Sequence, residues 1–210
     1  HHCPASTWRL IIDHFKQNDQ LRVLGVTATP DRADEESLGQ IFETVAYDYE
    51  LLDAIHDGWL LPVEQQMVTI AGLDFSGMRT TAGDLNGADL AAVMEAEKNV
   101  QGMVGAGIQI IGERSTLFFA SSVRHAEMAC NIFNRHRAGM AGFICGKTET
   151  EERRKTLKEF QDGKLQVLCN VGIATEGFDA PAASVILNGR PTKSRALYAQ
   201  IAGRSLRPLP

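Results

Sequence analysis

The chain has 210 residues, 44% of them hydrophobic, and a formal net charge of -5, which is ordinary for a globular protein of one or two domains. This charge excludes a polycation that holds nucleic acid by bulk electrostatics alone. The four cysteines are widely spaced, so neither a disulfide framework nor a zinc site is expected, and a reducing compartment is favoured. No signal peptide and no apolar run near the ~20 residues of a membrane span is present. We therefore expect a cytoplasmic protein without membrane contact.

Two elements are predicted before residue 30. Apolar side chains recur at helical spacing and predict an amphipathic helix with a buried face: Trp8, Ile11, Ile12 and Phe15. The apolar run 21–26 predicts a buried strand, which Pro30 ends. Hydroxyl side chains follow that strand at Thr27 and Thr29, where they are also simply good turn formers.

The middle of the chain is less regular. Residues 36–43 and 50–57 predict short helices, the second ended by Gly58. Residues 59–70 predict a strand, and the Gly-, Asp- and Thr-rich stretch 71–87 predicts a connector.

Residues 88–112 predict a helical segment that is interrupted by three glycines, at Gly102, Gly105 and Gly107. These glycines follow no strand and lack the spacing of a dinucleotide-binding fingerprint, so we reject that interpretation.

From Ser115 onward, strands and helices alternate. Strands are predicted at 116–120, 140–145, 165–169 and 184–187, and helices at 123–136, 149–162 and 194–206. Thr148 and Glu151 predict a capping box, and Gly163 predicts the end of that helix. Alternation with short connections predicts a parallel α/β sheet covered by helices on both faces. Ligands of such sheets bind beyond the carboxyl ends of the strands, where Ser121, Gly146, Thr175 and Gly177 fall.

Gly146-Lys147-Thr148 follows a strand and opens a helix, as a phosphate-binding loop does. The first glycine of such a loop would stand at position 141, which is Ala141 inside the predicted strand. We therefore reject a phosphate-binding loop here.

The most specific pattern lies near the C-terminal end. Thr-Glu-Gly-Phe-Asp occupies 175–179 after a strand, where a glycine lets the backbone approach a ligand and Asp179 can accept from a ribose hydroxyl. Gln-x-x-Gly-Arg-x-x-Arg follows at 200–207. Arg204 and Arg207 are expected one helical turn apart on one face, so that both guanidinium groups reach one target. Their planar forks of donors suit a polyphosphate.

These two segments resemble motifs V and VI of superfamily 2 DEAD/DEAH-box helicases, and most of all bacterial and phage members related to type III restriction subunits. Thr27-Ala28-Thr29-Pro30 is similar to motif III, and His1 is similar to the last residue of the Asp-Glu-x-His motif. The resemblance implies two RecA-like domains. Residues 1–60 would be the C-terminal part of the first, ATP-binding domain, 61–87 the connecting strand and linker, and 88–210 the second, C-terminal helicase domain.

The resemblance also implies roles for single residues. Catalytic roles fall on His1, Gln200, Arg204 and Arg207, with the two arginines as arginine fingers. Nucleotide contacts are implied for Gly177, Asp179 and Gly203. Thr27 and Thr29 would couple the ATP state to nucleic-acid binding. Contacts with nucleic acid are implied for Ser121, Lys147 and Thr175. No metal ligand is expected within the chain.

Plainer interpretations of several of these residues remain open. Ser122, beside Ser121, would cap the next helix, Thr175 would be a turn hydroxyl, and Asp179 would cap a turn before Pro181. His1 would belong to a tag remnant, a metal-binding His-His-Cys or a histidine surface.

The implied function is ATP-driven translocation on DNA, or its unwinding, with ATP and Mg²⁺ between the two domains and RNA as the other substrate. A nuclease or modification subunit is a candidate partner. The chain lacks the phosphate-binding loop and the Asp-Glu pair, so we expect a fragment of a larger enzyme without appreciable ATPase of its own. The alternatives are a non-catalytic nucleic-acid-binding module and the motor part of a type III-like restriction enzyme.

Overall fold

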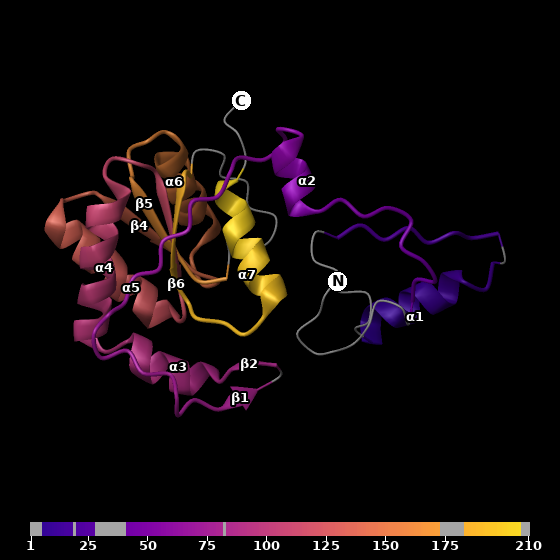
Figure 1. Ribbon diagram of the computed structural model, residues 1–210, viewed down its shortest axis with the longest axis horizontal. Coiled ribbons are helices and arrows are strands. Elements are labelled where there is room, and N and C mark those ends of the chain that lie inside the picture. Colours follow the sequence, from indigo (N-terminus) through magenta and orange to yellow (C-terminus); the bar gives the residue numbers. More distant parts are fainter. Residues whose placement is uncertain (1–5, 19, 28–40, 82, 173–182, 207–210) are drawn as a thin grey trace.

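The computed structural model describes residues 6–18, 20–27, 41–81, 83–172 and 183–206, and the structural statements below concern these residues. A four-stranded parallel sheet with the order β4-β5-β3-β6 lies inside the compact part of the structure, on the left in Figure 1. The strands are β3 (Thr116–Ala120), β4 (Ala141–Ile144), β5 (Val167–Asn170) and β6 (Val185–Gly189). Phe118 at the middle of β3 is in register with Cys169 of β5 and Leu187 of β6.

Helices cover both faces of this sheet, which confirms the predicted α/β fold. On one face, α4 (Glu97–Ile111) and α5 (Val123–His136) pack against Phe118 and Ala120. On the other face, α6 (Thr150–Gln161) and α7 (Arg195–Ala202) pack against Leu117 and Phe119. All five residues of β3 are buried, because successive side chains of a central strand point into opposite layers of the core.

Two details of the predicted helices are corrected. Residues 88–112 form two helices, α3 (Gly87–Met94) and α4, which are separated at Glu95 and Ala96. The capping box at the start of α6 is wrong, because the Thr148 hydroxyl accepts a hydrogen bond from the Cys145 N–H at 2.9 Å within the preceding turn. Gly163 does follow the end of α6, with a φ of +72°.

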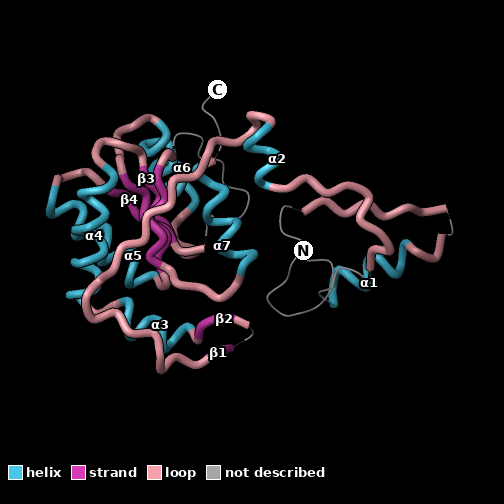
Figure 2. The backbone as a smooth tube through the Cα atoms, in the orientation of Figure 1, coloured by secondary structure: helices cyan, strands magenta, loops and turns pink. Residues whose placement is uncertain are grey.

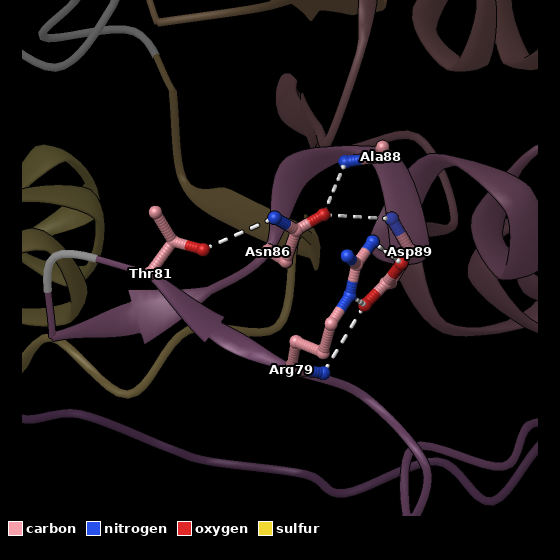
Figure 3. Close-up of polar contacts among 5 residues, drawn as sticks. All are labelled: Arg79, Thr81, Asn86, Ala88 and Asp89. Atoms are coloured by element: carbon pink, nitrogen blue, oxygen red, sulfur yellow. Dashed lines mark hydrogen bonds and ion pairs between the residues drawn. The ribbon is translucent and has the colours of Figure 1, made fainter.

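The connector at 71–87 contains a small antiparallel hairpin of β1 (Thr80–Thr81) and β2 (Asp84–Leu85). Figure 3 shows how it is joined to α3: the Arg79 guanidinium pairs with the Asp89 carboxylate, while Asn86 accepts from two backbone N–H groups at the helix start. The connector therefore contains secondary structure of its own that is hydrogen-bonded to α3.

The first part of the chain departs most from expectation. Helix α1 (Ser6–Phe15) forms, but its apolar face is exposed, and residues 21–26 form no strand. Val26 is 90% exposed. A parallel strand needs partners for its backbone N–H and C=O groups, and no described segment supplies them. Figures 1 and 2 show α1 lying apart from the layers around the sheet.

The segment between α1 and the connector is also less regular than predicted. The helix α2 (Leu51–His56) is followed by Gly58 at a φ of +79°, as expected. Residues 59–70 form no strand, although the Leu61 N–H donates to the Leu206 carbonyl at 2.8 Å. Residues 36–40 of the predicted helix 36–43 lie outside the described residues, and 41–43 are not helical. None of the described helices has the length and apolar character that a membrane crossing requires.

Candidate functional site at the carboxyl ends of the strands

The carboxyl ends of the four parallel strands meet at one edge of the sheet, where ligands bind in folds of this kind. Ser121 follows β3, Gly146 and Lys147 follow β4, and Arg190 follows β6. β4 and β6 are the outer strands of the order β4-β5-β3-β6, so Lys147 and the β6–α7 loop begin about 14 Å apart, three strand spacings.

The loop after β3 is held by hydrogen bonds from both of its serines. The Ser122 hydroxyl caps α5 by accepting from the His125 N–H at 3.0 Å, which confirms the capping interpretation. It also donates to the Glu95 carboxylate at 2.6 Å. Ser121 is half-buried, and its Oγ lies 3.1 Å from Nδ1 of His125. The Ser121 hydroxyl, for which a nucleic-acid contact is predicted, is therefore held in place by His125.

His125 organises this loop, and sequence reasoning missed it. Its side chain is fully buried edge-on against Phe118, and burial lowers its pKa to about 4, outweighing the attraction of the Glu95 charge. The imidazole is therefore neutral at pH 7. Nδ1 accepts from the Ser121 N–H at 3.3 Å, so the proton sits on Nε2, which has no hydrogen-bond partner in the described structure. Only its place in the first turn of the helix could have drawn attention to it.

The loop after β4 presents Lys147 to solvent. The Arg153 guanidinium of α6 donates to the carbonyls of Cys145 at 3.1 Å, Gly146 at 3.4 Å and Thr148 at 3.3 Å. Carbonyl groups therefore converge on a cation here, whereas a phosphate-binding loop directs N–H groups toward an anion. This geometry supports the rejection of a phosphate-binding loop, and it leaves Lys147 exposed on a supported turn.

The loop between β6 and α7 is tied to the β1–β2 hairpin by Asp84 of β2. One carboxylate oxygen accepts from the Lys193 N–H at 2.7 Å, and the other accepts from the Thr192 hydroxyl at 2.9 Å. Partial burial would raise the pKa of Asp84, but these bonds, the Leu85 N–H and the charge of Arg190 together lower it. Asp84 is therefore ionised at neutral pH.

The end of α7 carries the remaining described candidates. Gln200, Gly203 and Arg204 are half-buried there. The helix predicted to continue to 206 ends at Ala202 and passes into a 3₁₀ turn, Gly203–Ser205, that contains Arg204. A Cβ placed on Gly203 would meet no atom within 4 Å, so no packing contact requires a glycine here.

Half of the predicted site residues cannot be placed in this geometry. Six lie outside the described residues: His1, Thr29, Thr175, Gly177, Asp179 and Arg207. Thr27 is described and is exposed outside any strand. Among the described residues, no cluster of three or more His, Cys, Asp or Glu side chains comes together.

The family described as "Helicase conserved C-terminal domain" matches residues 89–208, which is more than half of the chain. The chain belongs to this family of superfamily 2 helicases. The match covers the sheet, its flanking helices and the end of α7.

Individual relatives agree with this family. A Saccharomyces cerevisiae protein named "Putative ATP-dependent helicase IRC3" is 32% identical over 213 residues, covering 99% of this chain and 31% of its own length. The "Type I restriction enzyme EcoAI endonuclease subunit" of Escherichia coli is 40% identical over 84 residues, covering 39% of this chain and 10% of its own length. The helicase chain thus spans about a third or less of these curated relatives.

One solved structure shares the fold across nearly the whole chain. It is the fragment structure of a "putative HsdR subunit of a type I restriction enzyme" from Vibrio vulnificus YJ016. The TM-score is 0.69 at 21% identity, and the match covers 97% of this chain and 39% of that one.

Proposed function

We propose that this chain is part of an ATP-dependent enzyme that moves along DNA or unwinds it, and that residues 88–210 are its second RecA-like domain. The observation that carries the proposal is the placement of Gln200, Gly203 and Arg204 where α7 ends beside a parallel sheet. A nucleotide held by a first domain would meet these side chains across a cleft. The names of the helicase relatives support ATP as the cofactor.

Arg204 is proposed as an arginine finger. A guanidinium group directed at a transferred phosphoryl group neutralises the charge that develops in the transition state. Arg204 is half-buried, which strengthens such an interaction relative to water. Gln200 would assist from one turn earlier on α7, and we keep Arg207 as the second finger. Mg²⁺, when bound, would neutralise phosphate charge, and its ligands would come mainly from residues other than those described.

Nucleotide and nucleic-acid contacts complete the proposal. Gly177 and Asp179 would meet the nucleotide, with Asp179 on the ribose. Ser121, Lys147 and Thr175 would contact the phosphates and sugars of the nucleic acid. Such contacts position a strand without reading its sequence. The relationship to a restriction enzyme favours DNA over RNA.

Residues 1–60 are proposed to be the end of the first RecA-like domain, joined by the linker 61–87. Their apolar side chains support this, since Leu24 is 82% and Val26 90% exposed. Exposed apolar surface of this kind marks a face that another element covers. In this proposal Thr27 and Thr29 couple the domains, His1 faces the nucleotide, and the 210 residues alone have no appreciable ATPase.

The motor of a restriction enzyme is the second candidate function, because the Escherichia coli relative is an endonuclease subunit. A nuclease or modification subunit would then be the partner. We propose the cytoplasm as the compartment, since Cys130, Cys145 and Cys169 are buried free thiols. A Schizosaccharomyces pombe relative is named "Putative mitochondrial ATP-dependent helicase irc3", so fractionation of cells that express the tagged protein is the direct check.

The deciding experiment measures ATP hydrolysis by the product of the complete reading frame, with single-stranded DNA, with RNA and with neither. We expect DNA to stimulate hydrolysis and Arg204→Ala to abolish it. Arg154→Ala is the matched control, because Arg154 is an exposed arginine of α6 paired with Glu151. A folded wild-type protein without hydrolysis would favour a non-catalytic nucleic-acid-binding module instead.

A further inference from the structure

We propose that Asp84 is a positioning residue that ties the linker hairpin to the start of α7 and so sets the orientation of Arg204. The inference rests on the proposed function, because it concerns the same arginine. Asp84 lies in the proposed linker and, besides the neighbouring Leu85 N–H, it bonds Thr192 and Lys193, which are 108 and 109 residues away along the chain.

The carboxylate of Asp84 engages the loop through both of its oxygens. Oδ1 accepts from the N–H of Lys193 at 2.7 Å, and Oδ2 accepts from the hydroxyl of Thr192 at 2.9 Å. Lys193 returns to the hairpin, since its ammonium donates to the Thr80 hydroxyl at 2.6 Å. Hydrogen bonds with a charged donor or acceptor are the stronger kind, and these three together fix the hairpin to the loop.

The hairpin itself is anchored, so it can act as a fixed support. Arg79, at its start, donates to both carboxylate oxygens of Asp89 on α3, at 2.9 and 2.7 Å, and its N–H donates to the same carboxylate at 3.1 Å. At the other end of the hairpin, Asn86 caps α3 and donates to Thr81 at 3.0 Å (Figure 3). The hairpin therefore moves with α3.

A continuous chain of hydrogen bonds leads from Asp84 into α7. The Thr192 hydroxyl that donates to Asp84 also accepts from the Ser194 N–H at 3.0 Å. Ser194 is the N-cap of α7, and its hydroxyl accepts from the Leu197 N–H at 3.2 Å. Asp84 thus fixes the first turn of the helix whose other end leads into Arg204.

A helix transmits a displacement of its first turn to its last. The eight residues of α7 span about 12 Å. A small displacement of the first turn at Ser194 therefore moves the last turn, next to Arg204, by a similar small distance. Misplacement of a catalytic group by ~1 Å costs on the order of a hundredfold in rate. Since the proposed linker joins the two domains, a displacement of the linker would be transmitted to Arg204 through Asp84.

The test replaces Asp84 with Ala in the complete protein and measures DNA-stimulated ATP hydrolysis. We expect kcat to fall about tenfold or more while KM for ATP changes less than about twofold, because the arginine acts in the transition state. Asp84→Asn should have a kcat between those of the wild type and Asp84→Ala, since its amide oxygen still accepts from the Lys193 N–H. Asp74→Ala is the matched control: Asp74 is a carboxylate of the same proposed linker, and it accepts from the Ser76 N–H of its own turn at 2.9 Å. A change in KM alone, or an equal loss in Asp74→Ala, would overturn the assignment.

A second measurement does not depend on activity. Hydrogen exchange of the backbone amides of 193–198 should accelerate at least about tenfold in Asp84→Ala, with β3 unchanged. Thr192→Val should have a similar effect, and the double variant should add little to it. If the wild type hydrolyses no ATP but the exchange changes as expected, the proposed function fails while the structural tie stands. Unchanged exchange at 193–198 would contradict the positioning role of Asp84 itself.

Discussion

The neutral imidazole of His125 holds the loop after β3 from inside the core. Its Nδ1 meets both the N–H and the hydroxyl of Ser121, and Gly189 of β6 makes room beside the ring, since a Cβ there would lie 3.2 Å from Cε1 of His125. The position of the Ser121 hydroxyl therefore depends on a histidine that stays uncharged.

This burial predicts a pH-dependent stability. The pKa of His125 is about 4 in the folded protein, against 6.5 for an exposed histidine, so the unfolded chain binds more protons between these values. The contribution of neutral His125 to the free energy of unfolding is therefore fully present above pH 6.5. It is lost as the pH falls toward 4, by about 3 kcal/mol at most. Urea unfolding at pH 7 and pH 4 should show this loss in the wild type. His125→Asn, whose amide oxygen can replace Nδ1 as acceptor, should show a smaller pH dependence. An equal loss of unfolding free energy between pH 7 and pH 4 in the two proteins would contradict the prediction.

A second residue-level prediction concerns the chemistry of Arg204. Arg204→Lys keeps the positive charge but loses the planar fork of donors. If Arg204 is a finger, Arg204→Ala should lower kcat by roughly 10³-fold or more, and Arg204→Lys should recover only a small part of that loss. Steady-state hydrolysis with saturating DNA measures both. Full activity in Arg204→Lys would mean that charge alone matters and would contradict a bidentate role.

At the level of elements, the glycines of α4 differ in function although they lie close together in sequence. A Cβ on Gly107 would approach Cδ1 of Leu187 on β6 to 2.7 Å, whereas a Cβ on Gly105 would meet nothing within 4 Å. Gly107 therefore allows α4 to lie against the sheet, and Gly105 lies on the exposed side of the helix.

Substitutions at these two glycines should change stability in opposite directions. Gly107→Leu overfills the contact with Leu187 and should lower the free energy of unfolding by about 1–3 kcal/mol. Gly105→Ala should raise it by up to about 1 kcal/mol, since alanine favours a helix. Thermal and urea unfolding of both variants measure the difference. A neutral Gly107→Leu would show that α4 can shift away from β6.

The sequence predicted the elements from Ser115 onward because β3 and β5 are buried along their whole length, β4 and β6 are buried in part, and each helix has one apolar face. It missed the break at Glu95 and Ala96, where no glycine or proline marks the end of α3. It also missed the hairpin, whose strands have two residues each and show no periodicity. The tie between Asp84 and Thr192 joins residues 108 apart, which no local pattern can indicate. Ser122 was predicted as a cap because its partner lies three residues away.

At the scale of the whole molecule, the apolar run 21–26 has the composition of a buried parallel strand but is exposed and belongs to neither sheet of the described segments. Composition indicates what a segment can form, and neighbouring strands decide whether it does. A buried parallel strand requires ladders on its sides and helices on its faces. The proposed first domain would supply both, so the conformation of this run depends on sequence that adjoins it in three dimensions.

Hydrogen exchange tests this dependence directly. In the 210-residue chain, amides of residues 21–26 should exchange fast, because the run belongs to neither of the described sheets. In the product of the complete reading frame they should be protected at least about 10³-fold, as amides of core strands are. The amides of β3 serve as the internal control, since their partners in β5 and β6 are present in both proteins. Fast exchange of 21–26 in both proteins would mean that this run is not a strand of a first RecA-like domain, and the proposed two-domain motor would lose its N-terminal half.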